Sequence, residues 1–443
     1  MDNRLRDEVE RNRGGIARLT RDLIRIPSPR LYEKEAARKV EEVMRSLSYD
    51  LVFTDDVGNI VGVLVGSDPT FTTVVTSHMD TVVPTRIESW RRSPFSGDIV
   101  ADRIEGVGAA DAKGGLAAQI FAGHVLATSR PRARGTIVVA ATVADENGCS
   151  IGVLHLLATT LPELGMSPSF VILGEPTGLT VGIGHDGWAA VDVAVRSPAE
   201  DVARRTGDDV VELLRALCDD NGVETPHVIM TADAPRKQRS GRDFLVTVRI
   251  FLRLFPGETV DDGIGWLEGS VLPSAGETRD AVVTVNVHEE EQLLYTGHTK
   301  RVSFWVPPWS MVVTHPLVER ARKVMLEAGC GWRPRPWKLN HLGSGTAGAV
   351  VSRELGLPVI GYGPGDEAQV HACNESVSLR ALLDAAYGTA ILMEGLPVAR
   401  YALPLETVLE KVAKTGSTGM EVRAGYGPAC AQPPLGARSR RRE

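Results

Sequence analysis

Residues 71–84 read FTTVVTSHMDTVVP, and this stretch decides the fold. A β-branched run ends abruptly in a polar His-x-Asp, which is the pattern of a buried strand followed by a turn. Open α/β sheets place their chemistry at such strand ends, and alternation along the strand puts His78 and Asp80 on one face. Asp80 could then orient a metal-bound imidazole. The alternative is a strand-end histidine that only hydrogen-bonds to a nearby acid.

The bulk composition excludes several classes of function. At 443 residues the chain is too long for one ordinary core, which predicts two domains. A net charge of −7 argues against nucleic acid or an anionic membrane as partner. No apolar run has membrane-spanning length, no signal peptide is visible, and five scattered cysteines suit a reducing compartment. We therefore expect a cytoplasmic protein.

Helix and strand patterns divide the chain into two regions. We predict a discontinuous catalytic domain of residues 1–185 and 309–400, interrupted at 186–308 by a small α+β domain. The tail, 401–443, lacks periodicity and is predicted to be partly disordered. The helices that we expect span residues 4–25, 33–47, 116–128, 202–217, 261–271, 315–328 and 379–394. The expected strands span residues 51–54, 60–65, 72–76, 137–143, 170–173, 244–255, 281–287, 301–306 and 359–362, while residues 191–195 alternate less clearly.

Polar clusters recur at strand ends and in glycine-rich loops. Besides the His-x-Asp pair these are Asp111 in GVGAADAKGG, the Glu146-Asn147 pair, Glu175, and His371 in QVHACNES. Histidine and carboxylate without thiolate suit zinc, cobalt or manganese at a hydrolytic site. A carboxylate shared by two ions would help to activate water and polarise a carbonyl.

Each cluster alone also has a structural explanation. A glycine-rich loop can be only a tight turn, Asp111 can cap a helix, and Glu175-Pro176-Thr177 can form a turn. His371 alone can be an ordinary loop histidine, and we assign His124 and His185 to packing. The occurrence of all five clusters in one order favours a shared site.

The segments SHMDTV, GAADAKGG, ADENG, GEPT and GPGD…VHACNE, in that order, resemble the M20 metallopeptidase family. That family includes acetylornithine deacetylase, succinyl-diaminopimelate desuccinylase and glutamate carboxypeptidase, and the resemblance covers about residues 15–395. It implies an α/β fold: a mixed-sheet, zinc-peptidase-like catalytic domain with an inserted, ferredoxin-like lid that pairs two subunits as a homodimer. It also implies an amidohydrolase that cleaves an N-acyl amino acid or a short peptide.

The resemblance further implies roles for the first residues of the site. His78 would bind one metal, with Asp80 as its orienting acid. Asp111 would bridge two metals and precede a cis peptide bond. Glu146 would be the general base that takes a proton from metal-activated water. The metal is expected to be one or two Zn²⁺ ions, with Co²⁺ or Mn²⁺ as alternatives.

By the same resemblance, Glu175 and His371 would complete the two ligand sets, and Arg253 would hold a substrate carboxylate. Asn147 stands where the family normally has a second acidic metal ligand. A neutral amide oxygen is a weaker ligand than a carboxylate. Either the second metal binds loosely, or the site works with one ion, or it is no longer hydrolytic.

A second departure lies in the inserted domain. Related enzymes carry a Gly-x-x-Ala-His segment whose histidine stabilises the oxyanion of a neighbouring site. Here residues 196–201 read RSPAED, with Glu200 near the histidine position and no histidine between His185 and His227. A carboxylate cannot donate unless protonated, so we expect a specialised substrate or an altered reaction, including amide exchange or formation. The competing hypothesis is a non-catalytic binding protein of the same fold that keeps at most one metal.

Overall fold

The computed structural model describes residues 3–129, 133–148, 150–219, 228–232, 234–275, 280–331, 334–337 and 345–397. Chain contacts group Met1–Ala402 into one compact unit. The tail of residues 401–443, which we predict to be partly disordered, lies outside the described residues. None of the described helices combines the length and the apolar character needed to span a bilayer.

A mixed nine-stranded sheet carries the larger part of the fold. Its strand order is β1-β2-β6-β3-β7-β19-β8-β17, with β18 beside β8. At its centre β3 (Asp68–His78) runs parallel to both β6 (Gly135–Thr142) and β7 (Pro168–Leu173). Every residue of β6 is buried, which is why it reads as a continuous apolar run. The other strands of this sheet are β1 (Leu51–Thr54), β2 (Ile60–Leu64), β8 (Val181–His185), β17 (Trp309–Ser310), β18 (Pro334–Trp337) and β19 (Val359–Gly361).

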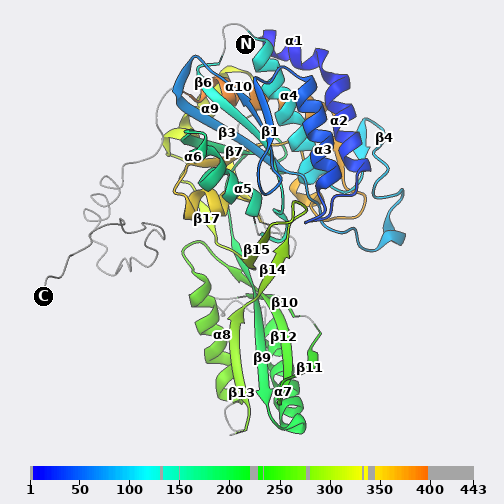
Figure 1. Cartoon of the computed structure of the whole chain (residues 1–443), viewed down its shortest axis with the longest axis vertical. Coiled ribbons are helices and arrows are strands. Elements are labelled where there is room, and N and C mark those ends of the chain that lie inside the picture. The colour runs from blue at the N-terminus through cyan, green and yellow to red at the C-terminus, as the bar shows by residue number, and fades with distance from the viewer. Residues whose placement is uncertain are drawn as a thin grey trace, which may run out of the picture. The chain divides into compact units, whose positions relative to one another are not determined.

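Helices cover both faces of this sheet (Figure 1). Neighbouring residues of a strand face opposite sides, so Val75 and Val139 enter one buried cluster and Val74 and Val138 enter another. The first cluster is closed by α1 (Asn3–Arg11), α2 (Arg13–Arg25), α3 (Lys34–Ser46), α4 (Gly114–Thr128), α9 (Pro316–Glu327) and α10 (Leu379–Gly395). The second is closed by α5 (Ile151–His155), α6 (Leu161–Glu163) and the short helical segments η4 (Leu156–Thr160) and η5 (Val350–Glu354).

Two local features differ from the sequence predictions. The helix expected over residues 4–25 is broken at Asn12, whose backbone leaves the helical conformation. The Asn12 side-chain amide donates to the Glu8 carbonyl at 2.9 Å, and such side-chain bonds compete with the helical hydrogen bonds. The sequence also missed β8, because Gly182 and Gly184 weaken its strand pattern.

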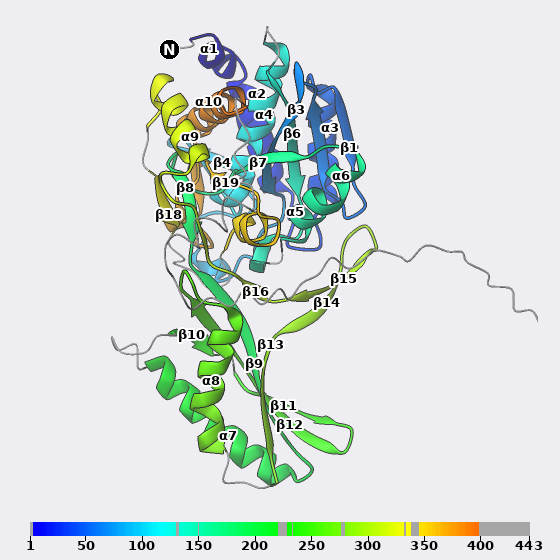
Figure 2. The same cartoon turned by 90° about the vertical axis from the view of Figure 1, so that its left-hand side faces the viewer.

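A second sheet is built from the segment between β8 and β17. Its order is β10-β12-β9-β13, with β11 beside β12 and β16 beside β9. Helices α7 (Glu200–Asp219) and α8 (Val260–Ala275) pack on this sheet (Figure 2). The strands are β9 (Gly187–Ser197), β10 (Val228–Ala232), β11 (Arg236–Ser240), β12 (Asp243–Leu254), β13 (Val282–Val287) and β16 (Trp305–Val306). All of them fall within residues 186–308, and the boundaries of an inserted domain stay a prediction.

Smaller elements complete the described chain. The strand expected over residues 301–306 is divided, because β15 (Thr299–Ser303) pairs with the acidic strand β14 (Glu289–Leu293). A further sheet joins β20 (Ser376–Ser378), β5 (Arg103–Glu105) and β4 (Asp98–Val100). The predicted α/β class with a mixed sheet is confirmed.

Candidate metal centre

The site forms where the three central parallel strands end. His78 is the last residue of β3, Asp145 and Glu146 follow β6, and Glu175 follows β7. Parallel strands finish at the same edge of a sheet, so these polar side chains converge although they are far apart in sequence. Asp111 and the His371 loop reach the same place from outside the sheet.

His78 is fixed on both ring nitrogens. Its Nε2 lies 3.2 Å from Asp111 Oδ1, and its Nδ1 lies 2.9 Å from the carbonyl oxygen of Asp80. The Asp80 carboxylate is 3.5 Å from Nδ1 at its Oδ1 and accepts the backbone N–H groups of Asp145 and Glu146. Asp80 therefore positions both the histidine and the loop after β6.

Asp111 lies between two histidines. Its Oδ2 is 3.8 Å from His371 Nε2, on the opposite side from the contact with His78. His371 Nε2 is also 3.1 Å from Glu146 Oε2. The peptide bond from Asp111 to Ala112 is cis, as the family resemblance implies.

The groups that could hold a metal fall into two overlapping sets. The ligand atoms of His78, Asp111 and Glu146 lie within 4.8 Å of one another, as do those of His78, Asp145 and Glu175. Asp145 Oδ1 is buried and has no hydrogen-bond partner among the described residues. A buried carboxylate oxygen left in this state is costly without a cation. Imidazoles and carboxylates of this kind fit zinc, cobalt or manganese.

Burial and the neighbouring charges shift the pKa values of the site residues. Burial disfavours the charged form of His78, but the hydrogen bonds with Asp111 and Asp80 outweigh it and raise its pKa well above the ordinary value. Burial raises the pKa of Glu175 well above its usual range and that of Asp145 to about 6. A site that attracts protons so strongly also attracts divalent cations, which compete with protons for the same atoms.

Two buried acids that the sequence analysis did not single out shape the loops of the site. Glu375 accepts the backbone N–H groups of Gly108, Ala110 and Asp111 at 2.9, 2.6 and 2.9 Å. Glu33 accepts the N–H of Ala144 at 3.0 Å, just before the acidic pair. Glu375 stands in the QVHACNES motif, but only the folded chain shows that its carboxylate turns to the Asp111 loop.

Three further residues that the sequence placed at the site are not found among the candidate metal ligands. Arg253 donates from Nε and Nη2 to Asp186, its Nε bond being 3.0 Å long. Glu200 is exposed in the first turn of α7, where an acid favours the helix N-terminus. The side chain of Asn147 lies outside the described residues.

His185 is part of the packing, in line with the expectation from sequence. Its Nδ1 lies 2.7 Å from the Asp186 carbonyl, and its Nε2 accepts the N–H of Thr346 at 3.0 Å. Its ring stands edge-on to Trp309. Burial lowers the pKa of His185, so the neutral ring suits both hydrogen bonds.

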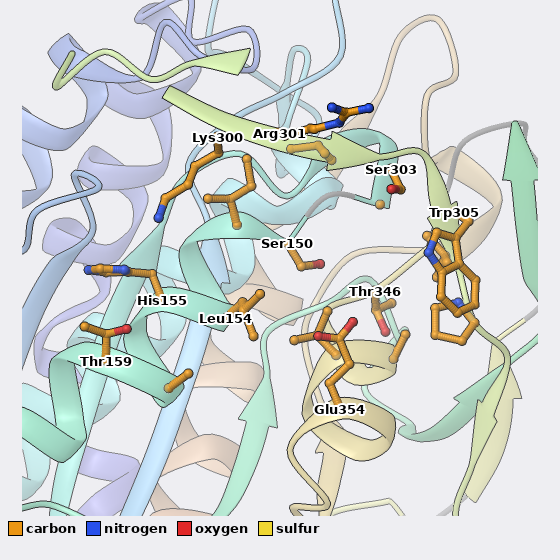
Figure 3. Close-up of a pocket in the computed structure, with 18 residues that line it drawn as sticks. Ser150, Leu154, His155, Thr159, Lys300, Arg301, Ser303, Trp305, Thr346 and Glu354 are labelled. Carbon is orange, nitrogen blue, oxygen red and sulfur yellow. The ribbon is translucent and has the colours of Figure 1, made fainter. Parts of the chain in front are cut away.

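A cavity of about 380 Å³ lies beside the start of α5, just after the acidic loop (Figure 3). Ser150 lines it and also hydrogen-bonds to the Asp145 carboxyl group, so one residue of the lining contacts a candidate metal ligand. Figure 3 shows Lys300 reaching toward His155, while Glu354 comes from the opposite wall. The lining combines charged groups with apolar ones, among them Leu154, Val302 and Trp305.

Comparisons with known proteins agree with this geometry. The profile of peptidase family M20/M25/M40 matches residues 74–394. The chain is 26% identical over 376 residues to the uncharacterized protein YgeY of Escherichia coli (strain K12), covering 81% of this chain and 89% of that protein. It is 26% identical over 399 residues to a Pyrobaculum aerophilum protein that bears the name LysW-lysine/LysW-ornithine hydrolase, covering 86% of this chain and 98% of that protein.

The structure is similar to that of the dipeptidase Dug1p of Saccharomyces cerevisiae, with a TM-score of 0.66 and 13% identity. That match covers 89% of this chain and 98% of the yeast chain, and it shows a shared fold. The profile match spans well over half of the chain and confirms the family that the motifs indicated. The chain belongs to the M20/M25/M40 peptidase family and is a metallohydrolase that acts on carbon–nitrogen bonds.

Proposed function

We propose that this enzyme hydrolyses the amide bond of an N-acyl amino acid or a short peptide at a zinc centre. The observation that carries the proposal is the position of Asp111, 3.2 Å from Nε2 of one histidine and 3.8 Å from Nε2 of the other. A carboxylate between two imidazoles suits the bridging position of a two-metal hydrolytic site. The relatives named as a LysW-lysine hydrolase and a dipeptidase support this substrate class.

The chain offers ligands for two ions. His78, Asp111 and Glu175 would hold one, and Asp111 and His371 would hold the other together with an acid of the loop after β6. When bound, the ions would polarise the scissile carbonyl and lower the pKa of the attacking water. Asp80 keeps the His78 ring oriented through its backbone carbonyl, which would leave Nε2 available to a metal.

Two features are proposed to bind substrate. The cavity beside Ser150 would receive one side of the substrate, because it shares that residue with the metal centre. Arg253 would bind the substrate carboxylate. That carboxylate would take the place of the Asp186 carboxylate as the hydrogen-bond partner of the guanidinium group. The absence of a histidine between His185 and His227 supports a specialised substrate.

The competing hypothesis of a non-catalytic binding protein is disfavoured by membership of a hydrolase family. The buried acid at position 146 also argues against it, because a site without chemistry has no need of a buried carboxyl grouped with His78 and Asp111.

Metal content and hydrolysis measured together test the proposed function. Purified chain should contain zinc and cleave members of a panel of N-acyl amino acids and dipeptides. Asp111→Asn should lose metal and activity, because an amide bridges two cations poorly. Asp56→Asn, an exposed control, should retain both. A wild-type chain loaded with zinc that cleaves no member of the panel would refute the proposal.

We also propose that the enzyme is a cytoplasmic homodimer paired through residues 186–308. The scattered cysteines support the location. In the sheet of this segment, β13 is the last strand in the order and offers an edge for a second copy.

A further inference from the structure

The cavity of Figure 3 holds a lysine and a glutamate that stay unpaired among the described residues. Lys300 of β15 and Glu354 of η5 both line it, and neither has a hydrogen bond or an ion pair with any residue that the structure describes. The neighbouring Arg301 differs, because its Nε donates to Glu289 at 2.9 Å. The cavity therefore offers one cation and one carboxylate to a ligand.

The two charges stand on opposite walls. Figure 3 shows Lys300 reaching toward His155, and Glu354 entering from the other side of the cavity. His155 has no hydrogen-bond partner in the described part of the chain, so its ring N–H is available on the wall of Lys300. Partial burial raises the pKa of Glu354, and no neighbouring charge of the described chain lowers it. A ligand that satisfies both walls must itself carry a negative and a positive group.

The wall that bears Lys300 is fixed at its hairpin tip to the loop before β2. β14 and β15 pair in antiparallel register, with Lys300 opposite Gln292. At the tip, Tyr295 donates from its hydroxyl to the Gly58 carbonyl at 2.7 Å, and Leu294 belongs to the first buried cluster of the large sheet. A Cβ on Gly58 would lie 2.5 Å from the Tyr295 ring, so this contact requires glycine. Lys300 therefore stands at a defined place in the cavity wall.

We propose that the cavity binds an acidic aminoacyl group, which is a glutamyl or aspartyl residue with a free amino group. The free carboxylate of that group contacts Lys300 and His155, and its ammonium contacts Glu354. This inference rests on the proposed hydrolysis and names its acyl group. Water supplies the oxygen to the acyl carbon and a proton to the leaving nitrogen, so the products are the free acidic amino acid and an amine.

The charges of the walls favour this class over simpler acyl groups. An acetyl group would leave both charges unpaired. A dicarboxylic acyl group would pair only Lys300, and a neutral aminoacyl group would pair only Glu354. Charge-assisted hydrogen bonds are about twice as strong as neutral ones, so each missing group has a measurable effect. The cavity volume of about 380 Å³ suits a single residue, because it lies near the lower end of the usual range of about 300–1,000 Å³ for small-ligand pockets.

Matched substrates separate the two contacts. Both γ-glutamyl-alanine and α-glutamyl-alanine carry a free carboxylate and a free amine, and removal of the amine from either gives glutaryl-alanine. Removal of the free carboxylate gives γ-aminobutyryl-alanine and α-aminobutyryl-alanine. The wild type should cleave at least one glutamyl compound with a kcat/KM about 10-fold or more above those of its truncated analogues. The preferred linkage shows which carboxyl group of the residue carries the scissile bond.

Substitutions on opposite walls assign each group. Lys300→Met should remove the advantage of the glutamyl compound over its aminobutyryl analogue and keep its advantage over glutaryl-alanine. Glu354→Gln should do the reverse, and Lys300→Arg should retain both preferences. Lys323→Met and Glu327→Gln, in an exposed pair on α9 outside the cavity, are the controls and should leave both ratios unchanged.

Binding of free glutamate tests the cavity without hydrolysis. Isothermal titration of the zinc-loaded chain should show that L-glutamate binds the wild type more tightly than glutarate does. Lys300→Met and Glu354→Gln should each weaken glutamate binding about 10-fold or more. Thermal melts of both variants should match that of the wild type, since both side chains are exposed.

Equal cleavage of the glutamyl compounds and their truncated analogues would overturn the proposal. Preferences that neither Lys300→Met nor Glu354→Gln changes would overturn it as well. A wild type that cleaves other members of the panel but no glutamyl compound would refute this acyl group and leave the proposed hydrolysis intact. A chain that binds glutamate through Lys300 and Glu354 yet cleaves nothing would refute the hydrolysis and support the assignment of the cavity.

Discussion

Glu375 contributes no predicted ligand, yet three backbone N–H groups of the Asp111 loop donate to its buried carboxylate. The Gly108 N–H donates to one side-chain oxygen of Glu375, and the N–H groups of Ala110 and Asp111 donate to the other. The position of Asp111 between the two histidines therefore depends on an acid 264 residues further along the chain.

Glu375→Gln replaces one of the two acceptor oxygens by an NH₂ group, so that at least one N–H group of the loop loses its partner. We expect a loss of about 1–3 kcal/mol in the free energy of unfolding, because a buried donor stays unsatisfied. Zinc affinity should fall as well, since Asp111 is no longer held. Urea unfolding and zinc titration measure the two effects. Glu35→Gln on the exposed face of α3 is the control and should change neither. Unchanged zinc affinity in Glu375→Gln would contradict the role given to Glu375.

Buried acids also predict the pH dependence of the metal-free protein. Burial raises the pKa of Glu33 to about 7 and that of Glu375 to about 8. An acid whose pKa is higher in the folded state binds protons on folding. Its stabilising contribution is complete below the unfolded pKa of 4.5 and is lost as pH rises through 7 to 8.

Urea unfolding of EDTA-treated protein should therefore show stability falling between about pH 5 and pH 8. The exposed-site variant Glu35→Gln should show the same slope as the wild type. Stability that rises over this interval would mean that these carboxylates stay ionised in the folded chain.

At the scale of elements, glycine permits the close approach of α4 to the end of β7. A Cβ on Gly115 would lie 1.8 Å from the carbonyl oxygen of Gly174, the residue before Glu175. Backbone atoms cannot yield as a flexible side chain can, so any larger residue must move the ligand-bearing turn.

Gly115→Ala should therefore weaken zinc binding and lower the melting temperature. Gly14→Ala is a matched control, because nothing lies within 4 Å of its Cβ position in α2. Alanine there should raise stability by up to about 1 kcal/mol through helix propensity. Zinc affinity of Gly115→Ala equal to that of the wild type would show that the turn tolerates the displacement.

The cavity between α5, η4 and β15 gives a second prediction at this scale. Ala158 lines it, so Ala158→Trp should fill part of its volume and raise KM more than it lowers kcat. Glu163→Trp, on the exposed side of the same helical stretch, is the control. Steady-state kinetics on the best substrate of the panel measure KM and kcat of both variants. An unaltered KM in Ala158→Trp would exclude the cavity as part of the substrate site.

At the scale of the whole molecule, the proposed homodimer depends on the edge of the second sheet. Val282 on β13 is 61% exposed, and a charged residue at an edge strand opposes pairing with another chain. Val282→Lys should shift the dimer toward monomer in light scattering after size exclusion. Val313→Lys, at a site 57% exposed outside this sheet, should leave the mass unchanged. A monomeric wild-type protein would rule out the dimer.

The sequence by itself determined which residue types stand at the ends of buried strands, and therefore the fold class and the family. His78 and Glu175 each follow a buried run of apolar and β-branched residues, and such a local pattern can be recognised from the sequence alone. Asp111 and His371 were found only because the motifs occur in a known order.

Only the tertiary structure decided which acid meets which histidine. Glu146 and His371 are 225 residues apart, and their 3.1 Å contact depends on two loops brought together by the packing of the sheet and its helices. Glu33 and Glu375 were missed for the same reason, because their partners are backbone N–H groups of distant loops.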